Sequence, residues 1–348
     1  MKPNFDESLQ NLFCKAAAAG IFSKAVAGFI LPDGKTKVFP FETHRDSVFD
    51  IASLTKVCPT STLALKRILE GKLGLDDKVI DYIPELRTNY RESILVRHLL
   101  THSLDYCVPM STLKNLPPEK ILDFLFHYHF NRIPGSVFNY GNPASILLGI
   151  VLSRLSHKTL QEMGNDEFFI PLGMTRSGYN PKSLVPIDEI IPTENCTWRK
   201  RLIQGEVHDE SAFVLQKLFP VGSAGMFSTV PDLLKFVQML LNDGIFEGKR
   251  IIPSGVLEMI STNALEGRIP EICTALGWEL NSDKFMGKIH SPHTFGKTGF
   301  TGASIVGDRD KKAAVVLLSN FTYPERETSA ARIHEFRANL SKLFFKDI

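Results

Sequence analysis

The chain has 348 residues, of which 43% are hydrophobic and 22% are charged, and its formal net charge is +2. These proportions are ordinary for a soluble globular protein with a large core. A net charge so close to zero gives no case for nucleic acid or an anionic membrane surface as a partner. The length exceeds that of a common single core, so we expect one large domain with two lobes.

The cysteines and the first residues bear on the compartment. The five cysteines are odd in number, widely spread and without metal-ligand spacing, which predicts reduced thiols. Residues 1–7 lack a basic stretch followed by an apolar one, and residues 12–31 are interrupted by Lys15, Gly20 and Lys24. We therefore expect a cytoplasmic protein with no membrane span, or an exported one if a leader has been removed.

The first predicted elements are an amphipathic helix and a hairpin. Residues 5–19 carry apolar side chains at helical spacing. Residues 25–30 and 37–41 then read as strands on either side of a Pro-Asp-Gly-Lys turn at 32–35.

A helix is predicted next, from about Ser53 to Glu70, and Gly71 suits the position just after its end. Pro59 lies inside this helix and removes the backbone donor to the Thr55 carbonyl, so the helix should bend there. The bend could tune a site at the start of the helix or could simply be tolerated strain. The second interpretation is the simpler one.

The middle of the chain reads as helical and its end as a hairpin followed by a helix. Helices are expected at residues 94–102, 118–129, 143–156 and 160–169. Residues 302–307 and 313–318 read as strands around a turn at 308–311, and a terminal helix is expected from about Arg326 to Phe345. Strands at both ends of the chain imply one sheet built from both ends.

The most informative stretch for function is Ser53-Leu54-Thr55-Lys56 at the start of the predicted helix. The spacing places the serine and lysine side chains on one helical face. A serine hydroxyl is a weak nucleophile unless a base takes its proton, and lysine can do so only if its pKa is depressed by burial or by a second cation. Downstream, Tyr140-Gly141-Asn142 and Lys297-Thr298-Gly299 offer further polar groups.

In this order and rough spacing, Ser-x-x-Lys, Tyr-x-Asn and Lys-Thr-Gly resemble the motifs of the penicillin-recognising serine hydrolases, which include serine β-lactamases, DD-peptidases (penicillin-binding proteins) and related esterases. The class C β-lactamase branch is the most similar, because a tyrosine occupies the second motif and no separate glutamate base is evident. Four flanking segments also look like family sequence: 97–103, 171–174, 205–210 and 225–229. Ser103-Leu104-Asp105 departs from the Ser-Gly-Leu often found there.

The resemblance implies an α+β fold, an antiparallel β-sheet flanked by helices with an inserted all-helical lobe. We expect a single domain, 1–348, with a sheet lobe of residues 1–60 and 195–348 and a helical lobe of residues 61–194. The site should lie between the two lobes.

The resemblance also implies a mechanism, in which Ser53 forms a covalent acyl-enzyme. The helix dipole should favour the developing charge on Ser53, and Lys297 should help to keep Lys56 neutral so that its amine can accept the Ser53 proton. Tyr140, as phenolate or as relay, would assist proton transfer, and Asn142 would hold Lys56 and the substrate amide.

The Lys-Thr-Gly motif is expected on an edge strand beside the site. Lys297 and Thr298 would supply charge and a hydroxyl to a substrate carboxylate, and Gly299 would let the substrate approach the backbone. The backbone N–H groups of Ser53 and Phe300 would form the oxyanion hole. A lysine in this motif leans toward substrates with a free carboxylate.

Simpler interpretations exist for several of these residues. Ser53 could be only a helix N-cap, and Lys56 could be a solvated surface lysine, although both fit catalysis better. Asn142 could be the N-cap before Pro143, and that role can coexist with one at the site. The whole chain could also be a catalytically silent binding or regulatory protein, but the intact set of polar residues counts against this.

Histidines raise the question of a metal. His98 and His102 have i, i+4 spacing, but no glutamate accompanies them and the family uses no metal, so buried, hydrogen-bonded histidines are the better interpretation. The segment His208-Asp209-Glu210 and the pair His290 and His293 could line a pocket. We expect no metal and no cofactor, and a small-molecule substrate whose identity depends on the loops at 103–117 and 195–220.

Overall fold

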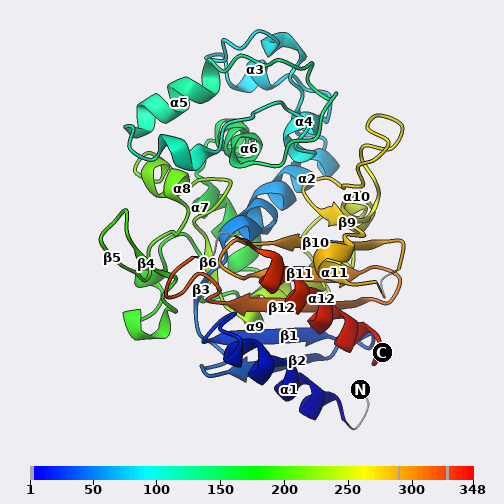
Figure 1. The fold of residues 1–348 in the computed structure, drawn as a ribbon. Coiled ribbons are helices and arrows are strands. Elements are labelled where there is room, and N and C mark those ends of the chain that lie inside the picture. The colour runs from blue at the N-terminus through cyan, green and yellow to red at the C-terminus, as the bar shows by residue number, and fades with distance from the viewer. Residues whose placement is uncertain (1–3, 289–290, 327–328) are drawn as a thin grey trace.

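The computed structural model describes residues 4–288, 291–326 and 329–348. At its centre is a six-stranded antiparallel sheet in the order β2-β1-β12-β11-β10-β9 (Figure 1). The strands are β1 (Ala25–Ile30), β2 (Thr36–Phe41), β9 (Glu279–Leu280), β10 (Thr294–Thr298), β11 (Ser304–Asp308) and β12 (Ala313–Ser319). Both predicted hairpins are confirmed, since β1 pairs with β2 and β11 pairs with β12. The sheet is built from both ends of the chain, because β1 pairs with β12.

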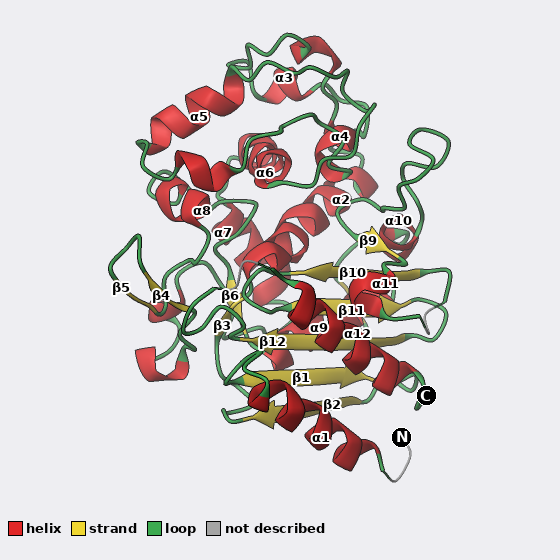
Figure 2. Ribbon diagram, viewed as in Figure 1, coloured by secondary structure: helices red, strands yellow, loops and turns green. Residues whose placement is uncertain are grey.

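Helices cover both faces of this sheet (Figure 2). Along β1, Val26 and Ile30 belong to the same buried cluster as helix α9 (Val230–Leu241), whereas Phe29 belongs to the cluster of α1 (Phe5–Ala18) and α12 (Ala331–Phe345). Alternate residues of a strand point to opposite faces, so a strand buried on both sides carries apolar residues throughout. All six residues of β1 are buried for this reason.

The middle of the chain is helical, as predicted, and lies beside one edge of the sheet (Figure 1). Its helices are α2 (Thr62–Leu69), α3 (Val79–Tyr82), α4 (Val96–Leu100), α5 (Pro118–Phe126), α6 (Asn142–Ser156) and α7 (Leu160–Gly164), with short turns η3 (Arg91–Ser93), η4 (Met110–Leu113), η5 (Asn165–Phe169), η6 (Pro181–Ser183) and η7 (Ile187–Glu189). Two of the predicted helices were too long. The helix expected at 94–102 ends before His102, whose left-handed φ of 51° is incompatible with a continuing helix. The helix expected at 118–129 ends before His127.

The predicted helix from Ser53 to Glu70 is wrong in its first half. Residues Ala52–Lys56 form a short 3₁₀ turn, η1, which is followed by an irregular turn, η2 (Val57–Ser61), and only then by α2. Cys58 has an extended conformation, with φ −122° and ψ 100°. The physical reason is Pro59, because a proline disfavours helical geometry in the residue before it as well as removing a donor. The bend expected at Pro59 is therefore a full interruption.

The remaining elements are short. They are β3 (Phe49–Asp50), β4 (Glu194–Cys196), β5 (Arg201–Ile203), α8 (Glu210–Leu215), β6 (Phe227–Ser228), β7 (Ile245–Phe246), β8 (Lys249–Arg250), α10 (Val256–Ser261) and α11 (Asp283–Met286). Helix α12 begins at Ala331 rather than near Arg326, and residues 327–328 lie outside the described part of the chain. The division into two lobes at the stated boundaries stays a prediction.

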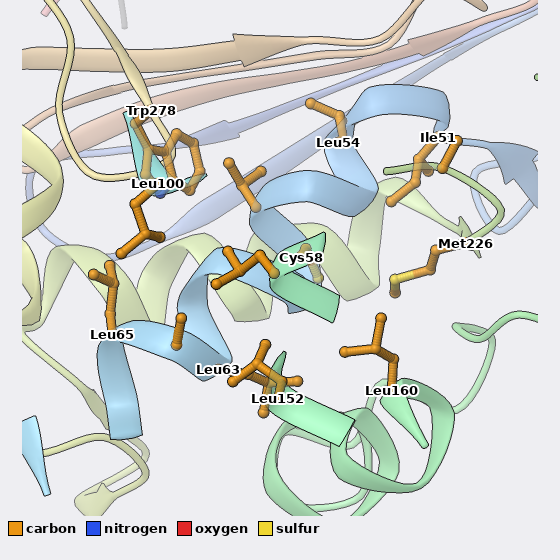
Figure 3. Close-up of a cluster of buried hydrophobic side chains, with 14 of the residues drawn as sticks. Ile51, Leu54, Cys58, Leu63, Leu65, Leu100, Leu152, Leu160, Met226 and Trp278 are labelled. Atoms are coloured by element: carbon orange, nitrogen blue, oxygen red, sulfur yellow. The ribbon is translucent and has the colours of Figure 1, made fainter. Parts of the chain in front are cut away.

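A cluster of buried apolar side chains holds the segment around Ser53 in place (Figure 3). Ile51, Leu54 and Cys58 are all fully buried in it. The Ile51 N–H also donates to the carbonyl of Met226 at 3.1 Å, so this segment is fixed by backbone pairing as well as by packing. No helix among the described residues is long and apolar enough to cross a membrane.

Candidate active site

Ser53 lies in the turn η1, directly after a residue with an unusual backbone. Ala52 has a left-handed φ of 46°, and its N–H donates to the carboxylate of Asp50 at 2.7 Å. A non-glycine residue adopts this geometry only where its surroundings impose it. The cap position of the turn is Ile51, so Ser53 is not an N-cap here, and any help from a helix dipole comes from one turn rather than from a long helix.

Lys56 lies next to Ser53 and is almost completely buried, with 2% exposure. Its Nζ is 3.0 Å from Ser53 Oγ, 2.8 Å from Asn142 Oδ1 and 2.9 Å from the Ser223 carbonyl. Burial lowers the pKa of Lys56, and the neighbouring Lys297 ammonium lowers it further, against the opposing effect of Tyr140. The structure therefore brings together three of the residues predicted from sequence, Ser53, Lys56 and Asn142.

The orientation of the Asn142 amide is fixed by Asp209, whose contact with Asn142 the sequence reasoning did not foresee. Asn142 Nδ2 donates to Asp209 Oδ2 at 2.9 Å and to Ser211 Oγ at 3.2 Å, which leaves Oδ1 facing Lys56. Asp209 also caps α8 by accepting the Ala212 N–H. Burial raises the pKa of Asp209, but the hydrogen bonds from Ser211, Ala212 and Asn142 outweigh it and the net shift is downward. A charged Asp209 is therefore the anchor of this amide.

Tyr140 reaches the same point from the loop before α6, as predicted. It remains 42% exposed and lines a cavity beside Ser53. Desolvation acts to raise the pKa of Tyr140, but the ammonium groups of Lys297 and Lys56 and a hydrogen bond with Ser53 outweigh it, so the pKa is lowered. His102 packs against the phenol ring with centroids 4.8 Å apart. Burial and the two lysines lower the pKa of His102 well below its usual value, so this ring is neutral.

Lys297 is buried behind Tyr140, with 1% exposure, and its Nζ lies 4.0 Å from the centre of the tyrosine ring. The same Nζ is 3.1 Å from Glu279 Oε1 on β9. Burial would lower the pKa of Lys297, but the charges of Tyr140 and Glu279 raise it overall, which keeps the ammonium charged. The outermost strand of the sheet is β9, but it pairs only with Phe295 and Gly296 of β10, so Lys297 and Thr298 lie beyond the part of β10 that β9 covers.

Gly299 packs closely against the backbone of the segment before Ser53. A Cβ at this position would lie 2.5 Å from the carbonyl oxygen of Ile51 and 3.4 Å from Cβ of Ala52. The Gly299 carbonyl accepts from the buried Arg337 of α12 at 2.8 Å. The glycine is thus required by the contact between the Lys-Thr-Gly turn and the turn that carries Ser53, and Thr298 ends strand β10 opposite Ser304.

We expect Gly299→Ala to displace the segment before Ser53. The added methyl group meets backbone, which cannot rotate away, and overpacking of this kind costs about 1–3 kcal/mol in the free energy of unfolding. Chemical denaturation should show the lower free energy of unfolding, and a turnover assay should show reduced activity. Gly178→Ala is a matched control, because its nearest neighbours, Gln161 and Leu184, are the far ends of side chains. Equal stability of the two variants would contradict the assignment.

The cavity beside Ser53 has a volume of about 450 Å³. Ser53, Tyr140, Asn142 and Phe300 line it, which brings the two residues of the expected oxyanion hole to the same space. Its polar lining includes Asp209 and Glu210, from a segment expected to line a pocket, and Arg326, which the sequence reasoning did not assign.

Of the histidines considered as candidate pocket or metal residues, His208 lines the cavity and His293 does not. His208 lines the cavity, donates its backbone N–H to Asp50, has Nε2 2.7 Å from Glu194 and stacks on Phe300. His293 instead pairs with Asp310 at 3.0 Å and is not among the cavity-lining residues, while His290 lies outside the described residues. His98 accepts a backbone hydrogen bond from Leu95. Among the described residues, no three His, Cys, Asp or Glu side chains come together as a metal site would need.

Comparison with known proteins identifies the family of this chain. The sequence model of the Beta-lactamase family matches residues 23–339. A relative from Escherichia coli K12, named "Putative D-alanyl-D-alanine carboxypeptidase", is 28% identical over 312 aligned residues, which cover 81% of this chain and 70% of the relative.

Two solved structures share the fold. A β-lactamase/D-alanine carboxypeptidase from Pseudomonas syringae has a TM-score of 0.75 at 19% identity, over 97% of this chain and 98% of that one. EstCE1, described as a hydrolase with promiscuous acyltransferase activity, has a TM-score of 0.70 at 22% identity, over 96% and 98%. Because the family match spans most of the sequence, this chain belongs to the Beta-lactamase family of serine hydrolases.

Proposed function

We propose that Ser53 is the nucleophile of an acyl hydrolase that works through a covalent acyl-enzyme. The observation that carries the proposal is the 3.0 Å contact between Ser53 Oγ and Lys56 Nζ at the wall of a cavity. In the first step a bond forms between Ser53 Oγ and the substrate carbonyl carbon, the Ser53 proton passes to the base, and the leaving group departs with a proton. Water then attacks the acyl carbon, the bond to Ser53 Oγ breaks, and a proton from the water passes through the base to Ser53 Oγ as the acid leaves.

Lys56 and Tyr140 share the proton transfers in this proposal. A neutral lysine amine has two N–H donors and one lone pair. The two donors are matched by the Asn142 amide oxygen and the Ser223 carbonyl, both of which can only accept, so the lone pair faces Ser53. Tyr140, with its lowered pKa, is suited to carry the proton on to the leaving group. The N–H groups of Ser53 and Phe300 would stabilise the oxyanion.

The substrate is a small molecule with an ester or amide carbonyl group: a β-lactam, a small ester or a D-amino-acid peptide. The names of the relatives cover the first and the last of these. A catalytically silent binding protein remains the other candidate, and the contacts among Ser53, Lys56 and Tyr140 count against it, since a binder needs no nucleophile paired with a base. All five cysteines are free thiols, which supports the expectation of a reducing, cytoplasmic compartment.

A fluorophosphonate probe tests the proposal directly. We expect one phosphonyl group per chain in intact-mass spectrometry, and peptide mapping should place it on Ser53. A hydrolysis panel of p-nitrophenyl esters, nitrocefin and a D-Ala-D-Ala peptide then identifies the substrate class. A chain that binds one of these compounds but neither reacts with the probe nor turns any of them over is a binding protein.

Lys297→Ala should move the pH dependence of kcat/KM. Lys297 lowers the pKa of both Tyr140 and Lys56, so its removal raises both values. A base with a higher pKa is deprotonated only at higher pH, and the acid limb of the profile should therefore shift upward. Lys284→Ala, which removes a lysine of helix α11, is the control. An unchanged acid limb in Lys297→Ala would show that this lysine does not tune the site.

A further inference from the structure

We infer that the cavity beside Ser53 selects neutral acyl substrates and disfavours those whose acyl group carries a carboxylate, with Glu210 as a specificity-determining residue. The inference rests on the function proposed above and concerns the charge of the substrate. Its basis is that the cations at the site are already held by the protein's own carboxylates.

Lys297 is the first of these cations. Its ammonium is 3.1 Å from Glu279, lies under the Tyr140 ring and is 1% exposed. It is not among the residues that line the cavity. The Lys297 charge, which the sequence motif was expected to offer to an anionic substrate, is therefore paired with a carboxylate of the protein itself.

Arg326 is the second, and it does line the cavity. Its guanidinium donates from Nε and Nη2 to the two oxygens of Glu194, at 2.8 and 2.7 Å, and from Nη1 to Glu210 at 2.8 Å. A guanidinium recognises a carboxylate best through two parallel hydrogen bonds, and Glu194 already makes that bidentate contact. Its remaining edge is held by Glu210, so the protein supplies carboxylates where an anionic substrate would bind.

The rest of the wall carries negative charge or none. Asp209 and Glu210 line the cavity as acids, whereas Met110, Pro109 and Phe300 present apolar surface. A substrate carboxylate would lose its hydration here, face two like charges and gain no free cation in return. A neutral ester has no such cost and gains apolar contact.

The test compares two p-nitrophenyl esters that differ only in the far end of the acyl chain, which is a neutral methyl ester in one and a free carboxylate in the other. The probes are p-nitrophenyl methyl adipate and p-nitrophenyl hydrogen adipate, with the spontaneous hydrolysis of each subtracted. A carboxylate without a charged partner loses roughly tenfold or more in affinity, so kcat/KM should be at least tenfold higher for the methyl ester. A smaller ratio, or preference for the free acid, overturns the inference.

A variant tests the role of Glu210. Glu210→Gln keeps the shape of the side chain but leaves one edge of Arg326 without a charged partner. We expect the ratio of methyl ester to free acid to fall at least threefold, and because it is a ratio within one preparation, a partial loss of folded protein does not affect it. The control is Glu206→Gln, which removes the partner of Arg201 and lies outside the cavity lining. The same ratio in wild type and Glu210→Gln overturns the role of Glu210.

These outcomes are distinct from failure of the proposed function. If neither ester is hydrolysed faster by the wild type than by Ser53→Ala, the acyl-enzyme proposal itself is wrong. If both are hydrolysed and the free acid is preferred, only the inference about charge is wrong.

Discussion

Ser53→Ala should reduce kcat by roughly 10⁴- to 10⁶-fold on any substrate that the wild type hydrolyses, the scale seen when a catalytic nucleophile is removed. The methyl side chain cannot form the acyl bond, and Lys56 then has no hydroxyl from which to take a proton. The structural change should be small, because Ser53 contributes its hydroxyl to the cavity wall and the apolar residues on either side hold the turn. Steady-state turnover and intact-mass spectrometry after incubation with a β-lactam or a phosphonate measure the effect.

The control for this prediction is a second serine on the same cavity wall, Ser111. Ser111→Ala should retain both turnover and the covalent adduct. Cys107 also lines the cavity and is exposed, so a reactive probe could attach there instead. An adduct that maps to Cys107, or one that persists in Ser53→Ala, would contradict the assignment of the nucleophile.

The sequence predicted the fold class and the parts of the site that depend on short spacings. Ser53 and Lys56 are three residues apart, so local geometry alone brings them together. The two hairpins are equally local, because turn residues lie directly between their strands. For Tyr140, Asn142 and Lys297 the order of three motifs in one chain carried the prediction, through the resemblance to a family whose fold brings such motifs together.

Interactions between distant segments could not be predicted. Glu279 is 18 residues from Lys297, and only the pairing of β9 with β10 places its carboxylate beside the ammonium. Asp209 belonged to a segment that looked like family sequence, but its contact with Asn142 spans 67 residues. Both acids act on groups of the site, since Glu279 pairs with the Lys297 ammonium and Asp209 orients the amide that faces Lys56.

One error had a local cause that was visible in the sequence. Pro59 predicted a bend, and the helix was nevertheless expected to continue from Ser53 to Glu70. Two effects act at that point, the missing donor of Pro59 and the exclusion of helical geometry at Cys58 before it. Together they end the first turn after Lys56, so that Ser53 and Lys56 lie on a short, separately anchored element.

The electrostatics of that element support a shared base. Lys56 and Tyr140 both have lowered pKa values, through burial and Lys297 for the amine and through the two ammonium groups for the phenol. Each is among the causes of the other's pKa shift, so in the proposed mechanism the two groups share the proton that leaves Ser53. Removing one member therefore leaves the other in a changed field rather than an intact base.

Lys56→Ala and Tyr140→Phe should each lower kcat by roughly 10²-fold or more, the usual effect of losing a general base. Lys56→Ala also removes the group that the Asn142 oxygen and the Ser223 carbonyl contact, so its effect should be the larger. Tyr140→Phe keeps the ring against His102 and removes only the hydroxyl. Lys66→Ala, in helix α2, is the control, because Lys66 pairs with Glu167 outside the cavity lining. Unchanged turnover in both site variants, with native circular dichroism, would exclude the shared base.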